Sequence, residues 1–206
     1  MTEFERMRRG EPYTFLDPEI LASLRHARKA CARLNACTSL SGEDYRKALT
    51  ELIPGVPESV KISPPFRCEH GNGIRIGAGS FINYGCVVFD QAPVVIGRYV
   101  KIGPCCELLT VNHPLDWRER RKPVEKALPI VIGDDVWLGG GVIVCPGVRI
   151  GARSVIAAGS VVVRDIPSDV LAAGNPAVVK RRLAPRDDMS PSPAPGNKNN
   201  CGPDDE

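Results

Sequence analysis

The sequence predicts a mainly β fold in which the chain coils into a stacked, three-sided prism. Aliphatic residues recur with a spacing of six, which matches neither the 3.6-residue repeat of a helix nor the two-residue repeat of a flat strand. The fourth residue after each aliphatic is also restricted, usually to a small or aliphatic side chain, and glycine often follows the aliphatic directly. The repeated aliphatic positions are Ile76, Ile82, Val88, Ile96, Ile102, Leu108, Ile132, Leu138, Val144, Ile150, Ile156 and Val162.

Each unit of six residues therefore supplies one short strand and one tight corner, with one aliphatic and one small side chain pointing inward. Coils of this kind bury one another, as in repeat proteins whose units contact only their neighbours. A sandwich of ordinary short strands is the alternative, but the strict phase from Ile132 to Val162 argues against it. The prediction is a parallel β-helix domain over residues 60–183.

The N-terminal segment, residues 1–59, has helical spacing instead. Asp17-Pro18-Glu19 can start a helix, because it combines a capping acid, a proline in the first turn and a negative charge at the positive helix end. A second helix is expected at Ser41-Gly42-Glu43-Asp44, which has the shape of a capping box, and should stop near Pro54-Gly55. The prediction is a helical hairpin over residues 17–53 that docks against one end of the prism.

A long interruption of the repeat follows Leu108, where roughly eighteen extra residues, from about His113 to Val131, precede Ile132. A loop extruded from a packed solenoid usually serves a binding face. His113 lies at the root of this loop, where its side chain could reach a cleft beside the prism. Imidazole is the side chain best suited to take a proton from a hydroxyl near neutral pH. His113 is therefore the candidate general base, and a structural loop histidine is the alternative.

The last coil is expected to end at Asp165-Ile166-Pro167, and residues 172–176 should form a turn before a basic strand that runs from Ala177 to Leu183. Residues 184–206 consist mostly of Pro, Ser, Asn and Asp, with almost no apolar side chain. Such a composition cannot bury enough apolar surface to fold. This C-terminal tail is predicted to be disordered.

The composition is typical of a soluble globular protein with one sizeable core: 206 residues, of which 43% are hydrophobic and 25% charged. The formal net charge of +3 is small, and no basic cluster is interleaved with aromatic residues. These features argue against a nucleic-acid partner. No segment has the length of a membrane span, and the first residues lack the apolar run of a secretory signal. We therefore expect a cytoplasmic protein with no membrane partner.

The eight cysteines form no CxxC pair with zinc-site spacing, so no metal is predicted. Cys86 and Cys106 fall on the small inward position of the repeat, where a free thiol behaves as a small hydrophobe. A carbonic-anhydrase-like activity would need three zinc-binding histidines on facing coils. The chain has only His26, His70 and His113, and His26 lies in the predicted hairpin.

Longer motifs add a specific resemblance over about residues 3–183. They are Gly10-Glu11-Pro12-Tyr13, Asp17-Pro18-Glu19, Gly71-Asn72-Gly73-Ile74-Arg75-Ile76-Gly77, Asn83-Tyr84-Gly85, Val136-Trp137-Leu138-Gly139 and Ala173-Gly174-Asn175-Pro176. Together they resemble the maltose and galactoside O-acetyltransferases, a family of hexapeptide-repeat acyltransferases. The resemblance implies a left-handed parallel β-helix, an exception to the usual right-handed crossover. It also implies a homotrimer in which acetyl-CoA and a small carbohydrate acceptor meet between neighbouring prisms.

The same resemblance gives His113 the role of catalytic base and places Asp17, Glu69, Asn83 and Gln91 at the acceptor. Glu69 stands where the family usually has Asp or Ser, and Gln91 replaces a usual acidic residue. A carboxylate can accept hydrogen bonds from sugar hydroxyls, which gives Glu69 a physical role. Asp17 could instead serve only as a helix cap.

On the donor side, the resemblance places the Gly140 amide opposite the thioester, where it would stabilise the oxyanion that forms on attack. Val178 stands where the family usually has a second arginine for the nucleotide. For Trp137, packing at a coil corner is the alternative to a place beside the cleft. The other expected contacts with acetyl-CoA are Trp137, Ala158, Val163, Arg164 and Arg181.

The predicted function is an O-acetyltransferase that moves acetyl from acetyl-CoA to a hydroxyl of a sugar of the maltose, glucose or galactoside class. The acceptor oxygen would attack directly, with His113 as general base. No acyl-enzyme is expected, because neither Cys105 nor Cys106 has a paired base. The alternatives are an acetyltransferase for serine or an amino sugar, and a catalytically silent hexapeptide-repeat binding protein.

Overall fold

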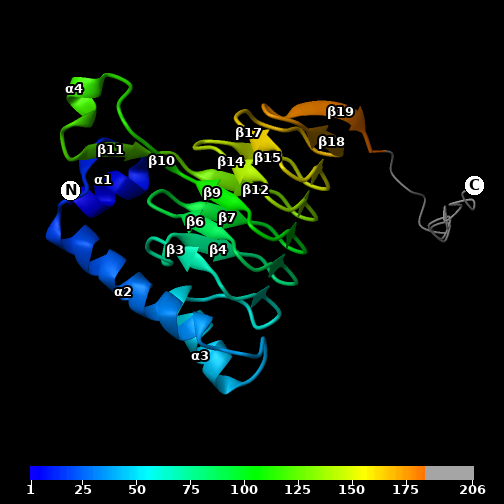
Figure 1. The fold of residues 1–206 in the computed structure, drawn as a ribbon, viewed down its shortest axis with the longest axis horizontal. Helices are drawn as coiled ribbons and strands as arrows, with labels where there is room; N and C mark the ends of the chain where they lie inside the picture. The colour runs from blue at the N-terminus through cyan, green and yellow to red at the C-terminus, as the bar shows by residue number, and fades with distance from the viewer. Residues whose placement is uncertain (184–206) are drawn as a thin grey trace, which may run out of the picture.

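The computed structural model describes residues 1–183, and Figure 1 shows their arrangement. Short strands stack into a prism, helices cover one end and one flank of it, and an insertion projects beside the first helix. The disorder predicted for residues 184–206 lies outside the described residues. The domain boundary placed between residues 59 and 60 stays a prediction.

Three sheets of mostly parallel strands form the faces of the prism. The first face contains β2 (Lys61–Ile62), β5 (Phe81–Ile82), β8 (Lys101–Ile102), β13 (Trp137–Leu138), β16 (Val155–Ile156), β18 (Val170–Ala173) and β19 (Val178–Arg182). The second face contains β3 (Arg67–Cys68), β6 (Val87–Phe89), β9 (Glu107–Leu109), β14 (Ile143–Val144) and β17 (Val161–Val162). The third face contains β4 (Ile74–Ile76), β7 (Val94–Ile96), β12 (Ile130–Ile132) and β15 (Arg149–Ile150).

The predicted six-residue repeat is confirmed by burial and by strand register. Every aliphatic residue of the repeat is at most 7% exposed. The register stacks these side chains directly on one another, because Ile82 pairs with Ile102, Ile102 with Leu138, and Leu138 with Ile156. One continuous apolar column therefore fills the prism, and burial of such side chains is the main stabilising contribution to folding.

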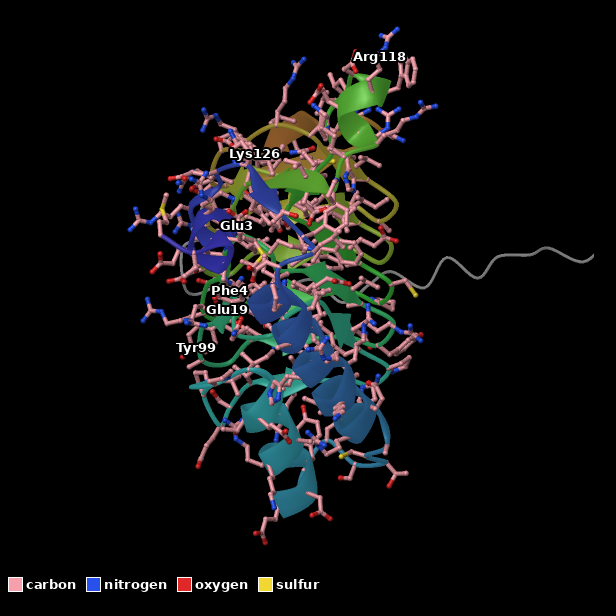
Figure 2. The ribbon with its side chains drawn as sticks, turned by 90° about the vertical axis from the view of Figure 1, so that its left-hand side faces the viewer. Glu3, Phe4, Glu19, Tyr99, Arg118 and Lys126 are labelled. Atoms are coloured by element: carbon pink, nitrogen blue, oxygen red, sulfur yellow. The ribbon has the colours of Figure 1, made fainter. Side chains whose placement is uncertain are left out.

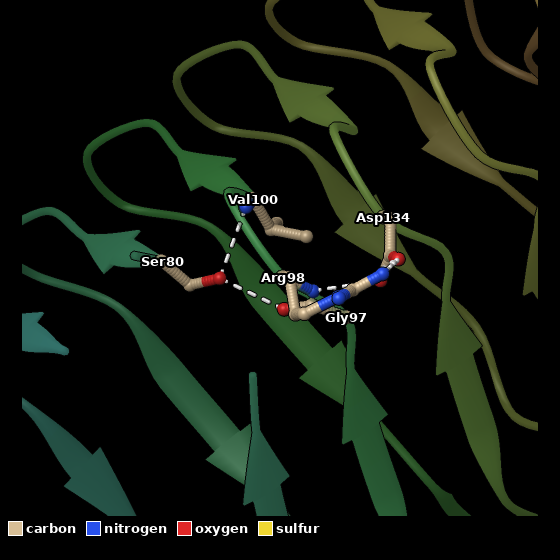
Figure 3. A network of polar contacts seen from close by, with 5 residues as sticks. All are labelled: Ser80, Gly97, Arg98, Val100 and Asp134. Atoms are coloured by element: carbon tan, nitrogen blue, oxygen red, sulfur yellow. Dashed lines mark hydrogen bonds and ion pairs between the residues drawn. The ribbon is translucent and has the colours of Figure 1, made fainter. Parts of the chain in front are cut away.

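The corners are closed by small residues because the coils approach closely there. A Cβ atom on Gly103 would lie 2.6 Å from the Gly140 nitrogen, and one on Gly139 would lie 2.5 Å from the Ala158 nitrogen. Inward polar groups are paired: the Ser80 hydroxyl donates to the Gly97 carbonyl (2.8 Å) and accepts from the Val100 amide (2.9 Å), as Figure 3 shows. Cys86 and Cys106 are buried, as predicted.

The helical hairpin is confirmed as α2 (Pro18–Asn35) and α3 (Glu43–Leu52). The capping box predicted at Ser41 is wrong: Gly42 is the cap residue of α3, and no side chain caps it. A further helix, α1 (Glu3–Arg9), was not predicted from the sequence. Thr2 and Glu5 form a capping box at its start.

The hairpin covers the first coil, as predicted, by supplying polar partners to its open edge. The Tyr45 hydroxyl accepts a hydrogen bond from the Ile62 amide (2.7 Å) and donates one to the Ile62 carbonyl (3.0 Å). The Asn35 side chain pairs in the same way with the backbone of Phe66 (2.8 and 3.0 Å). Backbone groups of the first coil, which would otherwise be buried without partners, are thereby satisfied.

The insertion is folded and contains β10 (Val111–Asn112), α4 (Trp117–Arg120) and β11 (Val124–Ala127). β11 lies between β10 and the N-terminal strand β1 (Tyr13–Thr14) in an antiparallel sheet. Figure 2 shows Arg118 at the outer tip of the insertion and Lys126 nearer the body of the molecule. The N-terminal segment therefore anchors the root of the insertion, where His113 lies.

The C-terminal end of the prism is closed by β18 and β19, which pair antiparallel. The turn between them falls at residues 174–177, later than the predicted 172–176, because Ala172 and Ala173 belong to β18. None of the helices within residues 1–183 combines the length and apolar character that a bilayer span requires.

Candidate active site

His113 lies directly after β10, at the point where the insertion leaves the prism. Its side chain is 50% exposed, and its Nε2 atom lies 3.7 Å from Oε2 of Glu125 on β11. Antiparallel pairing of Asn112 with Lys126 brings these two segments together. The Glu125 side chain is only 11% exposed, whereas the imidazole is half open to solvent.

Glu125 is itself held by Tyr13, its cross-strand partner on β1. The Tyr13 hydroxyl donates a hydrogen bond to Oε1 of Glu125. Burial and this hydrogen bond raise the pKa of Tyr13, so the phenol keeps its proton at neutral pH. One carboxylate oxygen is thus fixed by Tyr13 while the other faces His113, an arrangement that can stabilise an imidazolium.

A pocket of about 260 Å³ opens beside these residues. It brings together three of the predicted site residues, His113, Glu69 and Gln91. Its remaining lining is largely apolar and comes from Phe15, Ile20, Leu21, Leu24, Phe89 and Val111, together with Tyr13, His70 and Glu125. Apolar walls with a few convergent polar groups are typical of small-molecule sites.

Glu69 is half-buried at one end of the pocket. Burial raises the pKa of Glu69, and the nearby Arg28 guanidinium opposes that rise. Gln91 is buried at the next corner, and its side-chain oxygen lies 3.5 Å from the Thr110 hydroxyl. Both side chains can hydrogen-bond a hydroxylated ligand.

His70 lines the pocket, and Asp90 holds the backbone of His70 in place. The Asp90 carboxylate accepts hydrogen bonds from the His70 amide (2.8 Å) and the Gly73 amide (3.0 Å). The His70 ring is buried, with Nδ1 2.9 Å from the Ser23 hydroxyl, while Nε2 has no hydrogen-bond partner within the described residues. Burial lowers the pKa of His70 to about 4, so its ring is neutral at physiological pH.

Asp17 lies outside this pocket. Its carboxylate caps α2 by accepting hydrogen bonds from the amides of Glu19 (2.9 Å) and Ile20 (3.2 Å). Phe15, two residues earlier, lines the pocket instead. The structure therefore shows the capping role of Asp17, and its predicted contact with the acceptor stays a prediction.

The predicted site residues divide between two edges of the prism. Glu69, Gln91 and His113 lie at corners between the second and third faces, which we call the base edge. Val163 and Arg164, predicted at acetyl-CoA, follow β17 on the same edge. These residues fall at successive corners because each coil turns at the same place.

Asn83, Gly140 and Ala158 lie at corners between the first and second faces, which we call the amide edge. The Gly140 carbonyl accepts a hydrogen bond from the Gly159 amide (2.9 Å). Within the hydrogen bonds of residues 1–183, the Gly140 N–H has no acceptor. Its half-exposed amide is thus available to a ligand, but one chain does not bring it to His113.

The remaining predicted donor residues lie on exposed strands. Trp137 is exposed on the first face, and Arg181 is exposed on β19 with Val178 on the same strand. Among residues 1–183, no group of three or more His, Cys, Asp or Glu side chains is placed to hold a metal ion.

Comparison with known proteins identifies both segments of the chain. Residues 6–56 match the family described as the maltose acetyltransferase hexapeptide capping motif. Residues 129–164 match the family described as bacterial transferase hexapeptide (six repeats). A galactoside O-acetyltransferase of Lactococcus lactis is 32% identical over 89% of this chain and 89% of its own length.

Two solved structures extend the match to the whole described fold. A maltose O-acetyltransferase from Clostridium difficile has a TM-score of 0.87 and 34% identity, over 90% of this chain and 99% of its own. A hexapeptide-repeat-containing acetyltransferase from Vibrio cholerae, complexed with acetyl-CoA, has a TM-score of 0.83 and 42% identity, over 90% and 100%.

These matches confirm the predicted left-handed parallel β-helix. The relatives extend over nearly the whole length of both chains at more than 30% identity. The chain therefore belongs to the maltose and galactoside O-acetyltransferase family of hexapeptide-repeat acyltransferases.

Proposed function

We propose that the protein transfers the acetyl group of acetyl-CoA to a hydroxyl of a sugar, with His113 as general base. The observation that carries this proposal is the placement of His113 beside Glu125 at a pocket that Glu69 and Gln91 also line. Acetyl-CoA as the donor is supported by the Vibrio cholerae acetyltransferase, which is complexed with that ligand.

In this mechanism a sugar ring packs against the apolar wall while its hydroxyls hydrogen-bond Glu69 and Gln91. His113 takes the proton of the reacting hydroxyl, and Glu125 stabilises the imidazolium. The oxygen attacks the thioester carbonyl carbon, and the Gly140 N–H stabilises the resulting oxyanion. The C–S bond then breaks, the acetyl ester is released, and the CoA thiolate receives the proton from His113.

The separation of the two edges supports a site shared between copies of the chain. His113 on the base edge and Gly140 on the amide edge occupy different corners of one prism. His113 can act on the hydroxyl while Gly140 acts on the thioester carbonyl only if the base edge of one copy faces the amide edge of the next. Such head-to-tail contacts close into a ring, and we propose a homotrimer.

Acetyl transfer to a panel of acceptors tests this function, with release of the CoA thiol as the readout. We expect maltose, glucose or a galactoside to be acetylated, and His113→Ala to lower kcat by about 100-fold or more. His26→Ala, which changes an exposed histidine on α2, is the control and should be unaffected. Transfer only to serine, or only to the amine of glucosamine, would refute transfer to a sugar hydroxyl.

Calorimetric titration with CoA separates an enzyme from a silent binding protein. The proposal predicts saturable CoA binding to the wild-type chain and to His113→Ala. Absence of CoA binding, together with no thiol release for any acceptor, would refute acetyl transfer altogether.

A further inference from the structure

A second, larger hollow of about 720 Å³ lies between α2 and the second face of the prism. It adjoins the pocket at His113, because Glu69 and Phe89 line both. Its other walls come from the outer side of α2 and from β3 and β6. The two hollows therefore form one elongated groove that starts at the candidate base and runs toward the first coil.

Two arginines face this groove from different elements, Arg28 on α2 and Arg67 on β3. Neither guanidinium forms an ion pair or a hydrogen bond with another described residue, whereas Arg33 on the same helix pairs with Glu51. Two acidic residues line the groove: Glu125 lies at the His113 end, and Glu69 lines both hollows. Guanidinium groups with free donors bind carboxylate or phosphate in a bidentate manner.

The spacing of the coils separates Arg67 from His113, beside which the reacting hydroxyl would lie. Arg67 lies on β3, which is two strand positions from β9 in the second face. Adjacent strands are 4.7–4.9 Å apart, which places Arg67 about 10 Å along the prism from the level of β9. A second sugar unit that runs along the prism would extend the ligand from His113 to the level of Arg67.

We propose that the groove is a distal acceptor subsite for a saccharide of two or more units that carries an anionic group, a carboxylate or a phosphate, beyond the acetylated unit. Val87, Phe89 and Ala32 would pack against the intervening ring, and Arg28 and Arg67 would bind the anion. The inference rests on the proposed sugar O-acetyltransferase function and narrows its acceptor class.

Three matched acceptors test the subsite: maltose, maltose 1-phosphate and maltobionate, which carries a carboxylate. We expect at least one anionic acceptor to show a kcat/KM about tenfold or more above that of maltose, mainly through a lower KM, because charge-assisted hydrogen bonds are strong. Arg67→Gln and Arg28→Gln should each remove this preference, and Arg67→Gln should leave kcat with maltose unchanged. A preference for only one anion identifies which group the subsite binds.

Arg25→Gln is the matched control, since Arg25 is exposed on the same helix but does not line the groove. It should keep the anionic preference, which excludes a general effect of net charge. Equal kcat/KM for all three acceptors, or a preference that survives both groove substitutions, would overturn the subsite. In that case His113-dependent acetylation of maltose would still stand, whereas no acetylation of any sugar, glucose and galactosides included, would refute the function itself.

Discussion

Acidification from pH 7 to pH 5 is expected to destabilise the chain through His70. Burial lowers the pKa of His70 to about 4 in the folded chain, compared with about 6.5 for an unperturbed histidine. The unfolded chain therefore binds this proton more readily than the folded chain. The free energy of unfolding falls as the pH drops from about 6.5 to about 4 and changes no further on this account below pH 4.

The size of the effect follows from the shift. Each pKa unit corresponds to about 1.4 kcal/mol, so the full contribution of His70 is about 3 kcal/mol. Between pH 7 and pH 5 the loss amounts to about 2 kcal/mol, because protonation of the unfolded histidine is nearly complete at pH 5. His70 is 2% exposed and its Nε2 has no described partner, so water cannot hydrate the charged ring, and the Asp90 carboxylate offsets only part of the cost of charging it.

Urea unfolding of the wild-type chain and of His70→Gln at both pH values measures this loss, at a fixed protein concentration. The difference in free energy of unfolding between the two chains should change by about 2 kcal/mol between pH 7 and pH 5. His26→Gln, at an exposed histidine, is the control and should show little change. A pH-independent difference between wild type and His70→Gln would refute the reasoning.

Three further outcomes follow from the same structure. Asp17→Ala removes the cap of α2 and should cost about 1 kcal/mol in urea unfolding. A fall in kcat/KM larger than tenfold would support the predicted contact with the acceptor, and an unchanged kcat/KM would show that Asp17 serves only as a cap. Gly103→Ala would place a methyl group 2.6 Å from the Gly140 nitrogen and should lower both Tm and kcat; an unchanged kcat would remove that amide from the mechanism. Glu125→Gln should lower kcat by about tenfold with unchanged CoA affinity, and full activity would show that His113 needs no carboxylate partner.

The prism could be predicted because each coil repeats the same local requirement. An inward aliphatic such as Leu138 is needed in every unit, and a side chain on Gly103 would meet the next coil. The N-terminal helices were harder to predict from the sequence. α1 is short, and its capping signal at Thr2 and Glu5 was overlooked, while the similar pattern at Ser41 caps nothing.

The candidate site was only partly predictable, because its residues come together through pairings that no local pattern encodes. His113 was identified from its place at the root of the insertion. Glu125 was missed, because its approach to His113 depends on the antiparallel order of β1, β11 and β10. Arg28 was missed for the same reason: it gains a role only where α2 runs beside the second face.

The proposal that one site is built from two chains is tested most directly by mixing two inactive variants. His113→Ala disables the base edge, and Ala158→Trp places a bulky side chain on the exposed amide edge. Co-expression of the two chains in equal amounts should restore about a quarter of the wild-type acetyl transfer, since one contact in four then joins an intact base edge to an intact amide edge. Mixed trimers with no more activity than either variant alone would contradict a site shared between neighbouring copies.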